Sequence, residues 1–346
     1  MTKVIQIDKD FSVLDEASET LKNGGLVAFP TETVYGLGAN ALSPQAVENI
    51  FRAKGRPQDN PLIVHISNRD MLRGLVKAVP VAAEKLMDAF WPGPLTIIFE
   101  KSEAVPLTVT AGLSTVAIRF PSHPAAQYLI EKSGVPVAAP SANLSGTPST
   151  TRASHVIRDL TGRVDYIIDG GACRVGLEST VLDMTGAVPQ ILRPGGISLE
   201  ALREVLGEVV YEPALKDSRQ VPKSPGMKYR HYAPNADLYL VEPGHESELA
   251  ARLQECRREG TKTGVLRCSD AVYTADFIID CGKTPEAYAS RLFDALRRMD
   301  DLGAGVIFAE LPKDEGGIVP ALMNRMLKAS GGQVLSDGVV TKNERL

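Results

Sequence analysis

The sequence alternates short apolar segments typical of strands with amphipathic segments typical of helices, and this alternation limits the fold to the α/β class. Strands are expected at residues 26–30, 95–100, 115–120, 135–139, 166–169, 179–184 and 190–193. Helices are expected at 81–90, 123–132, 152–160 and 199–206, and from Ser43-Pro44 to a stop at Gly55. Because several strands follow each other without a helix between them, residues 1–207 predict a twisted mixed sheet.

The alternation is interrupted once, at residues 208–235, where no period is visible and where YRHYAP stands near the end of the stretch. A stretch of this length is usually functional or disordered, so we interpret it as a linker. From residue 236 the pattern restarts, with strands expected at 237–241, 263–267, 276–280 and 305–309 and helices at 246–258, 285–300 and 319–329. Residues 236–346 therefore predict a small Rossmann-like domain, although no GxGxxG follows its first strand.

Composition excludes several classes of protein. The net charge is −4, from 38 basic and 42 acidic residues, which does not suggest a chain that binds polyanions as a whole. No apolar run approaches the ~20 residues of a membrane span, and the N-terminus has no apolar core typical of a signal peptide. The four cysteines have no CxxC spacing, so we expect free thiols in a reducing compartment, the cytoplasm.

The common catalytic motifs GxxxxGK[ST], GxSxG and HExxH are missing, which leaves basic and hydroxyl residues at strand ends and loops. In KGRPQDNPL, Lys54 and Arg56 flank the end of a helix. Cations at a helix C-terminus also interact well with the helix dipole, which is a sufficient explanation for either residue alone. The prolines at positions 57 and 61 fix the following loop, however, and a fixed loop favours an oriented phosphate site.

The strand expected at 115–120 places a hydroxyl, a small residue and a guanidinium on one face, at Thr115, Ala117 and Arg119. Such a face could line a ligand cleft, and the alternative is an edge strand with one wet face. His65 lies in the apolar segment PLIVHIS and by itself is more typical of a satisfied core histidine.

Residues 139–151 are dense in hydroxyls and amides directly after an apolar strand, which is where α/β sheets bind ligands. The alternative is a hydroxyl-rich turn in which Thr150 or Thr151 caps the helix at 152–160. Further polar groups border strands at 178–180 and 193–196.

Together these segments resemble a known family. KGRPQDNPL, TETVYGLG, WPGPLT, TVAIRFP, APSANLSG and STVLD…ILRPGG are similar to the YrdC-like domain of the L-threonylcarbamoyl-AMP synthases. SPGMKYRHYAP and the second α/β domain resemble the long, two-domain form of these enzymes. The resemblance covers essentially the whole chain in order, and it implies a concave, positively charged cleft in the first domain.

The resemblance implies that L-threonine, bicarbonate and ATP give threonylcarbamoyl-AMP and pyrophosphate, a nucleotidyl transfer. It implies threonine contacts from Thr33, His65, Arg119 and Ser179, with backbone help near Ala139. It implies ATP contacts from Lys54, Arg56, Asn60, Thr115, Ser141, Asn143, Ser149, Arg193, Arg230 and Tyr232. Among these, Lys54, Arg56 and Arg193 are the candidates for neutralising charge as pyrophosphate leaves. Mg²⁺ is expected on the ATP phosphates and water, with no metal site built by the protein.

The implied product serves the t6A37 modification of tRNAs that read ANN codons, through a separate transferase complex. We also expect the linker to close as a lid over a labile carbamate. Two alternatives stay open at this point. One is a nucleic-acid-binding protein that uses two basic patches, for which the overall acidity and the absence of interleaved aromatic residues for base stacking are unfavourable. The patches are Arg52 with Lys54 and Arg56, and Lys223 with Lys228 and Arg230. The other is an enzyme that uses carbamoyl phosphate, although the related enzymes carry zinc-finger segments and no CxxC pair is present here.

Overall fold

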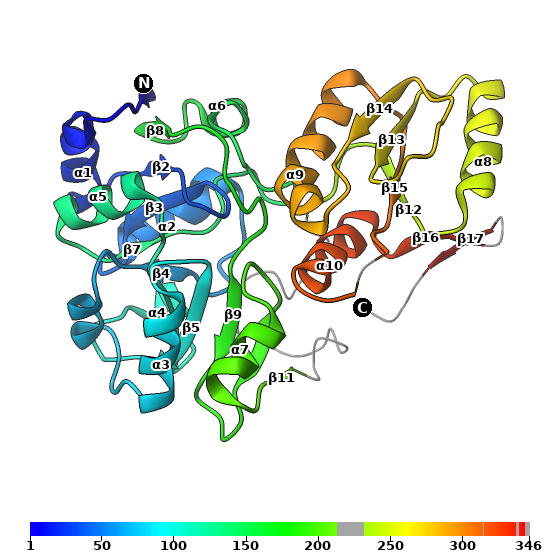
Figure 1. The fold of residues 1–346 in the computed structure, drawn as a ribbon. Coiled ribbons are helices and arrows are strands. Elements are labelled where there is room, and N and C mark those ends of the chain that lie inside the picture. Colours follow the sequence, from blue (N-terminus) through cyan, green and yellow to red (C-terminus); the bar gives the residue numbers. More distant parts are fainter. Residues whose placement is uncertain (213–231, 314, 337–338, 343–346) are drawn as a thin grey trace. The chain divides into compact units, whose positions relative to one another are not determined.

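The structure is a computed structural model that describes residues 1–212, 232–313, 315–336 and 339–342 (Figure 1). The chain divides into two compact units. One comprises Met1–Ser145 and Ser149–Lys228, and the other Gly146–Pro148 and Tyr229–Leu346. The linker expected at 208–235 lies mostly outside the described residues, as do Lys223, Arg230 and His231, so its boundaries and its role as a lid stay predictions.

The first unit is built on one mixed sheet, as the sequence predicts. Its strands are β1 (Lys3–Gln6), β2 (Val27–Phe29), β3 (Gly36–Asn40), β4 (Ile63–His65), β5 (Leu95–Glu100), β6 (Thr115–Arg119), β7 (Val137–Ala138), β8 (Tyr166–Asp169), β9 (Thr180–Asp183), β10 (Gln190–Arg193) and β11 (Val210–Tyr211). They pair in the order β1-β8-β2-β3-β7-β4-β6-β5-β9-β10-β11. Five of these pairings are antiparallel, including β4 with β7, β5 with β6 and β9 with β10.

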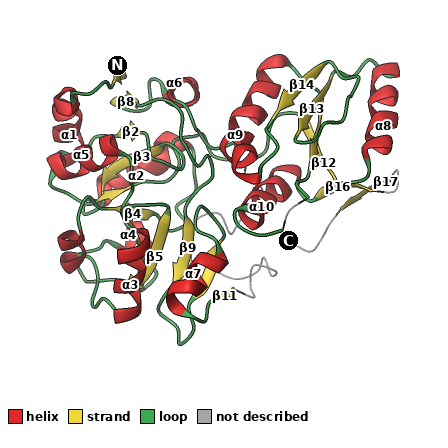
Figure 2. Ribbon diagram, in the orientation of Figure 1, coloured by secondary structure: helices red, strands yellow, loops and turns green. Residues whose placement is uncertain are grey.

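Helices surround this sheet on both faces (Figure 2). They are α1 (Asp15–Lys22), α2 (Pro44–Lys54), α3 (Val81–Phe90), α4 (Leu107–Thr110), α5 (Pro124–Ser133), α6 (Ala153–Leu160) and α7 (Leu199–Leu206), with 3-10 helices η1 (Phe11–Leu14) and η2 (Arg69–Gly74). One core packs α2, α3, α6 and α7 on one face. A second core packs α1 and α5 on the opposite face, against β2, β7 and β8.

The face that carries α1 and α5 continues over β4, β6, β5, β9 and β10, and there its apolar cluster is made of strand residues alone. Its members are Ile63, Ile98, Ala117, Val181 and Leu192. The register shows that this is one face, because His65 of β4 pairs with Val137 in the second core, and Ile63 pairs with Ala117. The candidate site lies on this part of the sheet.

Helix ends follow the expected chemistry at most positions. The Ser43 and Ser198 hydroxyls accept hydrogen bonds from Ala46 N and Ala201 N at the starts of α2 and α7, and Gly55 ends α2 in a left-handed conformation. The alternative in which Thr150 or Thr151 caps α6 is wrong. Both threonines are buried with their carbonyls bonded to other segments, and the N-cap residue of α6 is Arg152, which makes no side-chain cap hydrogen bond.

The second unit has the predicted Rossmann-like architecture. Its strands are β12 (Asp237–Val241), β13 (Thr263–Arg267), β14 (Phe277–Asp280), β15 (Val306–Glu310), β16 (Gln333–Ser336) and β17 (Val339–Lys342), in the order β14-β13-β15-β12-β16-β17. All neighbours are parallel except β16 and β17. Its helices are α8 (Glu246–Arg258), α9 (Pro285–Leu302) and α10 (Val319–Ser330).

Candidate active site

A polar row crosses five neighbouring strands of the first unit. His65 pairs with Arg119, Arg119 with Thr96, Thr96 with Val181, and Val181 with Arg193. Residues that pair in register share a face of the sheet and lie close together. The row includes the ends of β4, β6 and β10 and the starts of β5 and β9. Two guanidinium groups, an imidazole and a hydroxyl therefore line one edge of the apolar cluster that is made of strand residues alone.

Arg119 forms a buried ion pair with Glu32, which lies in the loop between β2 and β3. Arg119 Nη2 and Glu32 Oε1 are 2.8 Å apart, and each side chain is only 4% exposed. The two atoms are not aligned as a hydrogen bond, so charge attraction holds the pair. Glu32 Oε2 accepts a hydrogen bond from Ser122 N, and Arg119 Nε donates to Gly93 O at 3.4 Å. The guanidinium is therefore fixed at the carboxyl end of β6.

Ser179 lies just before β9 and contacts the row both in its middle, at Thr96, and at its Arg193 end. Its carbonyl accepts hydrogen bonds from both Nε and Nη2 of Arg193, at 3.1 and 2.9 Å, and its hydroxyl is 2.7 Å from Thr96 Oγ1. The neighbouring Glu178 accepts a hydrogen bond from Ser149 at 2.6 Å. Two predicted nucleotide contacts, Arg193 and Ser149, and the predicted threonine contact Ser179 are thus brought together through residues 178–179.

Lys54 ends α2 and is 3% exposed, with its ammonium turned to the loop after β7. Its Nζ donates to the carbonyl oxygens of Ser141 and Asn143, at 2.5 and 2.6 Å, and the Ser141 hydroxyl donates to Asn143 Oδ1. Three predicted nucleotide contacts therefore form one hydrogen-bonded cluster. A buried lysine of this kind does not contribute to an exposed basic patch. Arg56 instead lies against the Phe51 ring, 5.8 Å from its centroid.

His65 is buried and uncharged. Burial, and then the charge of Arg119, lower its pKa to about 3, and its Nδ1 lies 3.2 Å from Ile63 O. Thr33 is also buried, with its hydroxyl 2.9 Å from Thr31 Oγ1. Ala139 N donates to Ile63 O, so a contact from Ala139 to a ligand would use its carbonyl.

The remaining predicted residues lie apart from the row. Thr115 starts β6, and a rise of about 3.3 Å per residue puts it ~13 Å from Arg119, so the two would contact different parts of a ligand. Asn60 is buried in the loop after α2, and its Oδ1 has no hydrogen-bond partner. Tyr232 belongs to the second unit, where it packs on Phe293 with ring centroids 5.2 Å apart.

Sequence reasoning missed Glu32, Thr96 and the carboxylate of Glu178 as parts of this site. A glutamate between two threonines, directly after the apolar strand LVAFP, was the available signal for Glu32, because a buried cationic site needs counter-charges. Thr96 gave no signal, since a threonine inside an apolar strand is ordinary.

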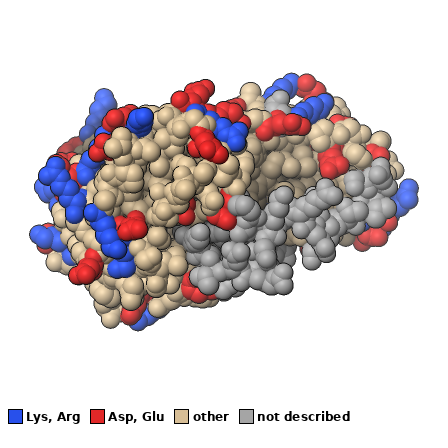
Figure 3. All heavy atoms as spheres, turned by 90° about the horizontal axis from the view of Figure 1, so that it is seen from below, with Lys and Arg blue, Asp and Glu red and all other residues tan. Residues whose placement is uncertain are grey.

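Three further features of the described residues are the surface charge, the groups that could bind a metal ion and the apolar character of the helices. On the face drawn in Figure 3, basic and acidic side chains are interspersed. Within the described residues, no group of three or more His, Cys, Asp and Glu side chains is placed to hold a metal ion. Nor does any helix in that part of the chain combine the length and apolar character needed to cross a membrane.

Comparison with known proteins places the chain in a family. The profile described as "Telomere recombination" (Sua5_yciO_yrdC) matches residues 19–195, and that described as "Threonylcarbamoyl-AMP synthase, C-terminal domain" matches residues 197–331. Curated threonylcarbamoyl-AMP synthases of Pyrococcus abyssi and Bacillus subtilis are 50% and 48% identical to the chain. These alignments cover 92% of this chain and 94% and 93% of those proteins.

A solved structure of P. abyssi Sua5 complexed with L-threonine has a TM-score of 0.92 and 47% identity, covering 97% of this chain and 99% of that one. The E. coli YciO structure, with a TM-score of 0.51 and 28% identity, covers 56% of this chain and 96% of its own. The chain spans nearly the full length of its two-domain relatives, and it belongs to the Sua5/YciO/YrdC family, in its two-domain threonylcarbamoyl-AMP synthase form.

Proposed function

We propose that this protein is an L-threonylcarbamoyl-AMP synthase, which uses L-threonine, bicarbonate and ATP to make threonylcarbamoyl-AMP and pyrophosphate. The observation that carries the proposal is the cross-strand row, which brings Arg119, His65 and Arg193 together with Ser179. Support comes from the relatives that bear this name and from the solved relative that holds L-threonine.

Threonine would bind at the His65 end of the row, with its carboxylate facing the guanidinium of Arg119. A neutral imidazole, with a pKa of about 3, is too weak a base to take a proton from the threonine ammonium. His65 would therefore act as an uncharged hydrogen-bond partner, together with the hydroxyls of Thr33 and Ser179. The site would hold threonine in position without accepting its proton.

The reaction needs no protein nucleophile. The threonine ammonium first loses a proton to solvent. The neutral amine then attacks the carbon of bicarbonate, a C–N bond forms, a C–O bond breaks, and the departing hydroxide leaves as water with a proton from the amine, which gives a carbamate. A carbamate oxygen then attacks the α-phosphorus of ATP, the bond to the bridging oxygen breaks, and pyrophosphate leaves with that electron pair. Catalysis would come from positioning and from charge stabilisation of the leaving group. The second step transfers a nucleotidyl group.

Lys54, Arg56 and Arg193 would stabilise the triphosphate. Carbonyl oxygens hold the Lys54 ammonium and the Arg193 guanidinium in fixed positions, which suits both groups to an oriented contact with phosphate. The partnerless Oδ1 of buried Asn60 is an acceptor for a donor on the nucleotide. The proposed set of ATP contacts is completed by the residues that the family resemblance implies, Thr115, Ser141, Asn143, Ser149, Arg230 and Tyr232.

Mg²⁺ would come bound to the ATP phosphates and supply further charge neutralisation there. The residues fit this mode of binding better than a protein-built site. The two buried carboxylates of the region are already engaged, Glu32 with Arg119 and Glu178 with Ser149. We also propose that the product passes to a separate tRNA threonylcarbamoyl transferase complex in the cytoplasm.

The test is pyrophosphate release from ATP with Mg²⁺ and bicarbonate, comparing L-threonine with L-serine, L-alanine and no amino acid. Mass detection of the nucleotide product should show threonylcarbamoyl-AMP, and Lys54→Ala should remove both signals. Threonine-independent pyrophosphate release, or no turnover by a folded chain that binds ATP, would contradict the proposal. Turnover with carbamoyl phosphate in place of bicarbonate would favour the second enzyme class instead.

A further inference from the structure

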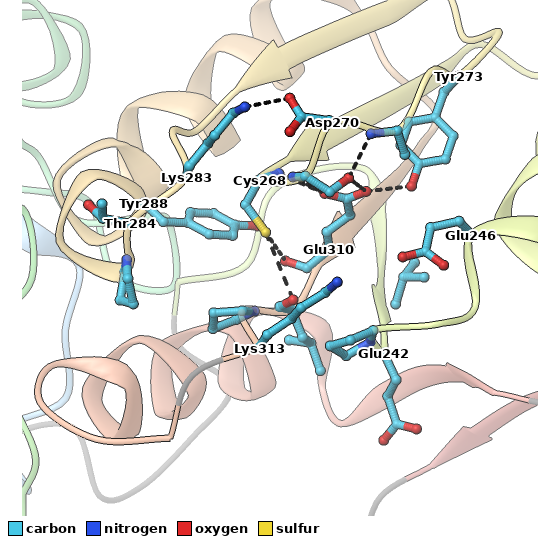
Figure 4. Close-up of a pocket in the computed structure, with 17 residues that line it drawn as sticks. Glu242, Glu246, Cys268, Asp270, Tyr273, Lys283, Thr284, Tyr288, Glu310 and Lys313 are labelled. Atoms are coloured by element: carbon cyan, nitrogen blue, oxygen red, sulfur yellow. Dashed lines mark hydrogen bonds and ion pairs between the residues drawn. The ribbon is translucent and has the colours of Figure 1, made fainter.

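The second unit contains a cavity of about 540 Å³ at the carboxyl ends of its parallel strands (Figure 4). The cavity is lined by residues at or within a few positions after the ends of β12, β13, β14 and β15, among them Glu242, Cys268, Lys283 and Glu310. Helix α8 leaves β12 on one face of the sheet, whereas α9 and α10 lie on the other face (Figure 1). Small molecules bind preferentially where connections leave an α/β sheet in opposite directions, and this volume is ordinary for such sites.

One wall of the cavity is a loop held by Glu310, which is buried. Its Oε1 accepts hydrogen bonds from the hydroxyls of Ser269, at 2.7 Å, and Tyr273. Its Oε2 accepts from the backbone N–H groups of Cys268 and Ser269, at 2.7 and 2.8 Å. All four donors are neutral, and no cation pairs with Glu310 within the described residues. The carboxylate therefore shapes the wall and leaves a negative charge in it.

The charges that line the cavity do not balance. Lys283 already pairs with Asp270, with Nζ and Oδ1 2.5 Å apart. In the part of the chain that the structure describes, Glu242 and Glu246 make no ion pair, and Lys313 is the other lysine of the lining. With Glu310, the lining carries three carboxylates and, outside the pair with Asp270, one lysine, so the cavity attracts cations and disfavours phosphates.

The negative charge of Glu310 also acts on the Cys268 thiol, which lies in the same wall of the cavity. Burial, and then the charge of Glu310, raise the pKa of Cys268 to about 12, so the thiol keeps its proton. A protonated thiol is a poor nucleophile, which points to a binding site and away from cysteine chemistry.

Tyr288, on the first turns of α9, supplies the second independent feature. It is 1% exposed, and its hydroxyl has no hydrogen-bond partner. Figure 4 shows the ring lying beside Thr284, with its hydroxyl end toward Cys268. Burial raises the pKa of Tyr288 well above its ordinary value, so the group stays a donor without an acceptor. A buried donor of this kind lowers the stability of the protein by about 1–3 kcal/mol unless an acceptor takes its hydrogen bond.

We propose that this cavity binds a small metabolite with a protonated alkyl amine and a hydrogen-bond acceptor, of the amino-acid class. The amine lies toward Glu242 and Glu246, and the acceptor takes the hydrogen bond of the Tyr288 hydroxyl. This site is separate from the proposed catalytic site in the first unit, so its test does not depend on synthase activity.

The test is calorimetric titration of the full chain at low salt with three ligands of matched chain length. L-lysine has both features, cadaverine has the amines without the carboxylate, and glutarate has only carboxylates. L-lysine should bind most tightly, cadaverine about 5-fold more weakly for lack of one hydrogen bond, and glutarate not at all. Tighter binding of cadaverine than of L-lysine would move the ligand to the polyamine class and overturn the assigned role of Tyr288.

Three variants locate the binding. Tyr288→Phe should bring L-lysine down to the affinity of cadaverine, without lowering the urea midpoint of the free protein, because it removes an unsatisfied hydroxyl. Glu242→Gln with Glu246→Gln should weaken both amines by about 10-fold. Glu248→Gln, on the same turn of α8 but outside the lining, is the matched control and should change neither affinity.

The proposal is overturned if glutarate binds better than both amines, or if neither amine saturates the protein by ~10 mM. It is also overturned if Tyr288→Phe keeps the preference for L-lysine over cadaverine, or if Glu248→Gln weakens binding as much as the double glutamine variant.

Discussion

Replacing Glu32 by glutamine should expose how the threonine site is held together before substrate binds. The substitution keeps the size of the side chain and an oxygen for Ser122 N, but it removes the negative charge 2.8 Å from the Arg119 guanidinium. Arg119 would then be a buried cation without its counter-charge, at the point where the carboxylate of L-threonine is proposed to bind.

The magnitude follows from burial. Both partners are 4% exposed, and removing one partner of a buried pair typically costs ~3–5 kcal/mol. The ion pair between Arg69 and Asp88, at 2.6 Å but 44% and 71% exposed, is the matched case at the surface. There, Asp88→Asn should cost about 0–1 kcal/mol. The difference between the stability losses of Glu32→Gln and Asp88→Asn measures the effect of burial, which neither loss measures alone.

The assay is urea unfolding of the full chain with and without saturating L-threonine. In the Glu32→Gln variant the threonine carboxylate replaces the missing counter-charge, so threonine should raise the unfolding midpoint more than it does in the parent. In a double variant with Arg119→Met both charges are gone. We expect it to regain much of the lost stability and to lose the response to threonine.

Two results would refute this reasoning. An unfolding midpoint that is the same for Glu32→Gln and Asp88→Asn would mean that the buried pair has no special role in stability. An equal gain from threonine in parent and Glu32→Gln would mean that threonine does not neutralise Arg119.

Three further predictions concern the same unit. Because burial lowers the pKa of His65 to about 3 from an ordinary 6.5, the unfolded chain binds a proton between these values that the folded chain does not. Stability should fall as pH drops below 6.5, by up to about 1.4 kcal/mol per pH unit from this group, and urea midpoints of His65→Gln should show a flatter decline. Arg193→Lys should lower turnover by about tenfold or more in the pyrophosphate assay, because an ammonium cannot reproduce the two hydrogen bonds to Ser179 O, whereas an unchanged rate would remove Arg193 from the site. Gly195→Ala would place a methyl group 2.2 Å from Thr180 N and should cost about 1–3 kcal/mol and most of the activity, while Gly186→Ala, with 3.6 Å to its nearest neighbour, should be close to neutral in thermal unfolding.

Elements with local signals could be predicted to within a residue or two. The helix Pro44–Lys54 has a serine cap and a glycine stop, and strand Leu95–Glu100 is an unbroken apolar run. Strand β3 is not among the strands expected from the sequence, because Gly36 and Gly38 are disfavoured in strands. The structure gives the reason for Gly38: a Cβ there would lie 2.7 Å from the Phe29 ring, so packing overrides propensity.

The candidate residues could be named from motifs, but their arrangement could not. Strands β4, β6, β5, β9 and β10 are neighbours in an order that differs from their order along the chain. The pairing of His65 with Arg119 and the bulge between Ile191 and Arg193 depend on register, which no local pattern specifies. The counter-charge from Glu32 was missed for the same reason, since it reaches Arg119 across the fold.

Close backbone approach explains why two motifs that are separated in sequence act as one part of the site. Gly195 lies so near residues 178–180 that no side chain fits between them. Thr180 Oγ1 both donates to Ile197 O and accepts from Ile197 N, at 2.6 and 2.9 Å, and the Arg193 guanidinium bonds Ser179 O. A shift of either segment must therefore move the other. The positions of the Ser179 hydroxyl, which is proposed to contact threonine, and of Arg193, which is proposed to contact the triphosphate, are consequently set together, so we expect substitutions in either segment to impair the binding of both substrates at once.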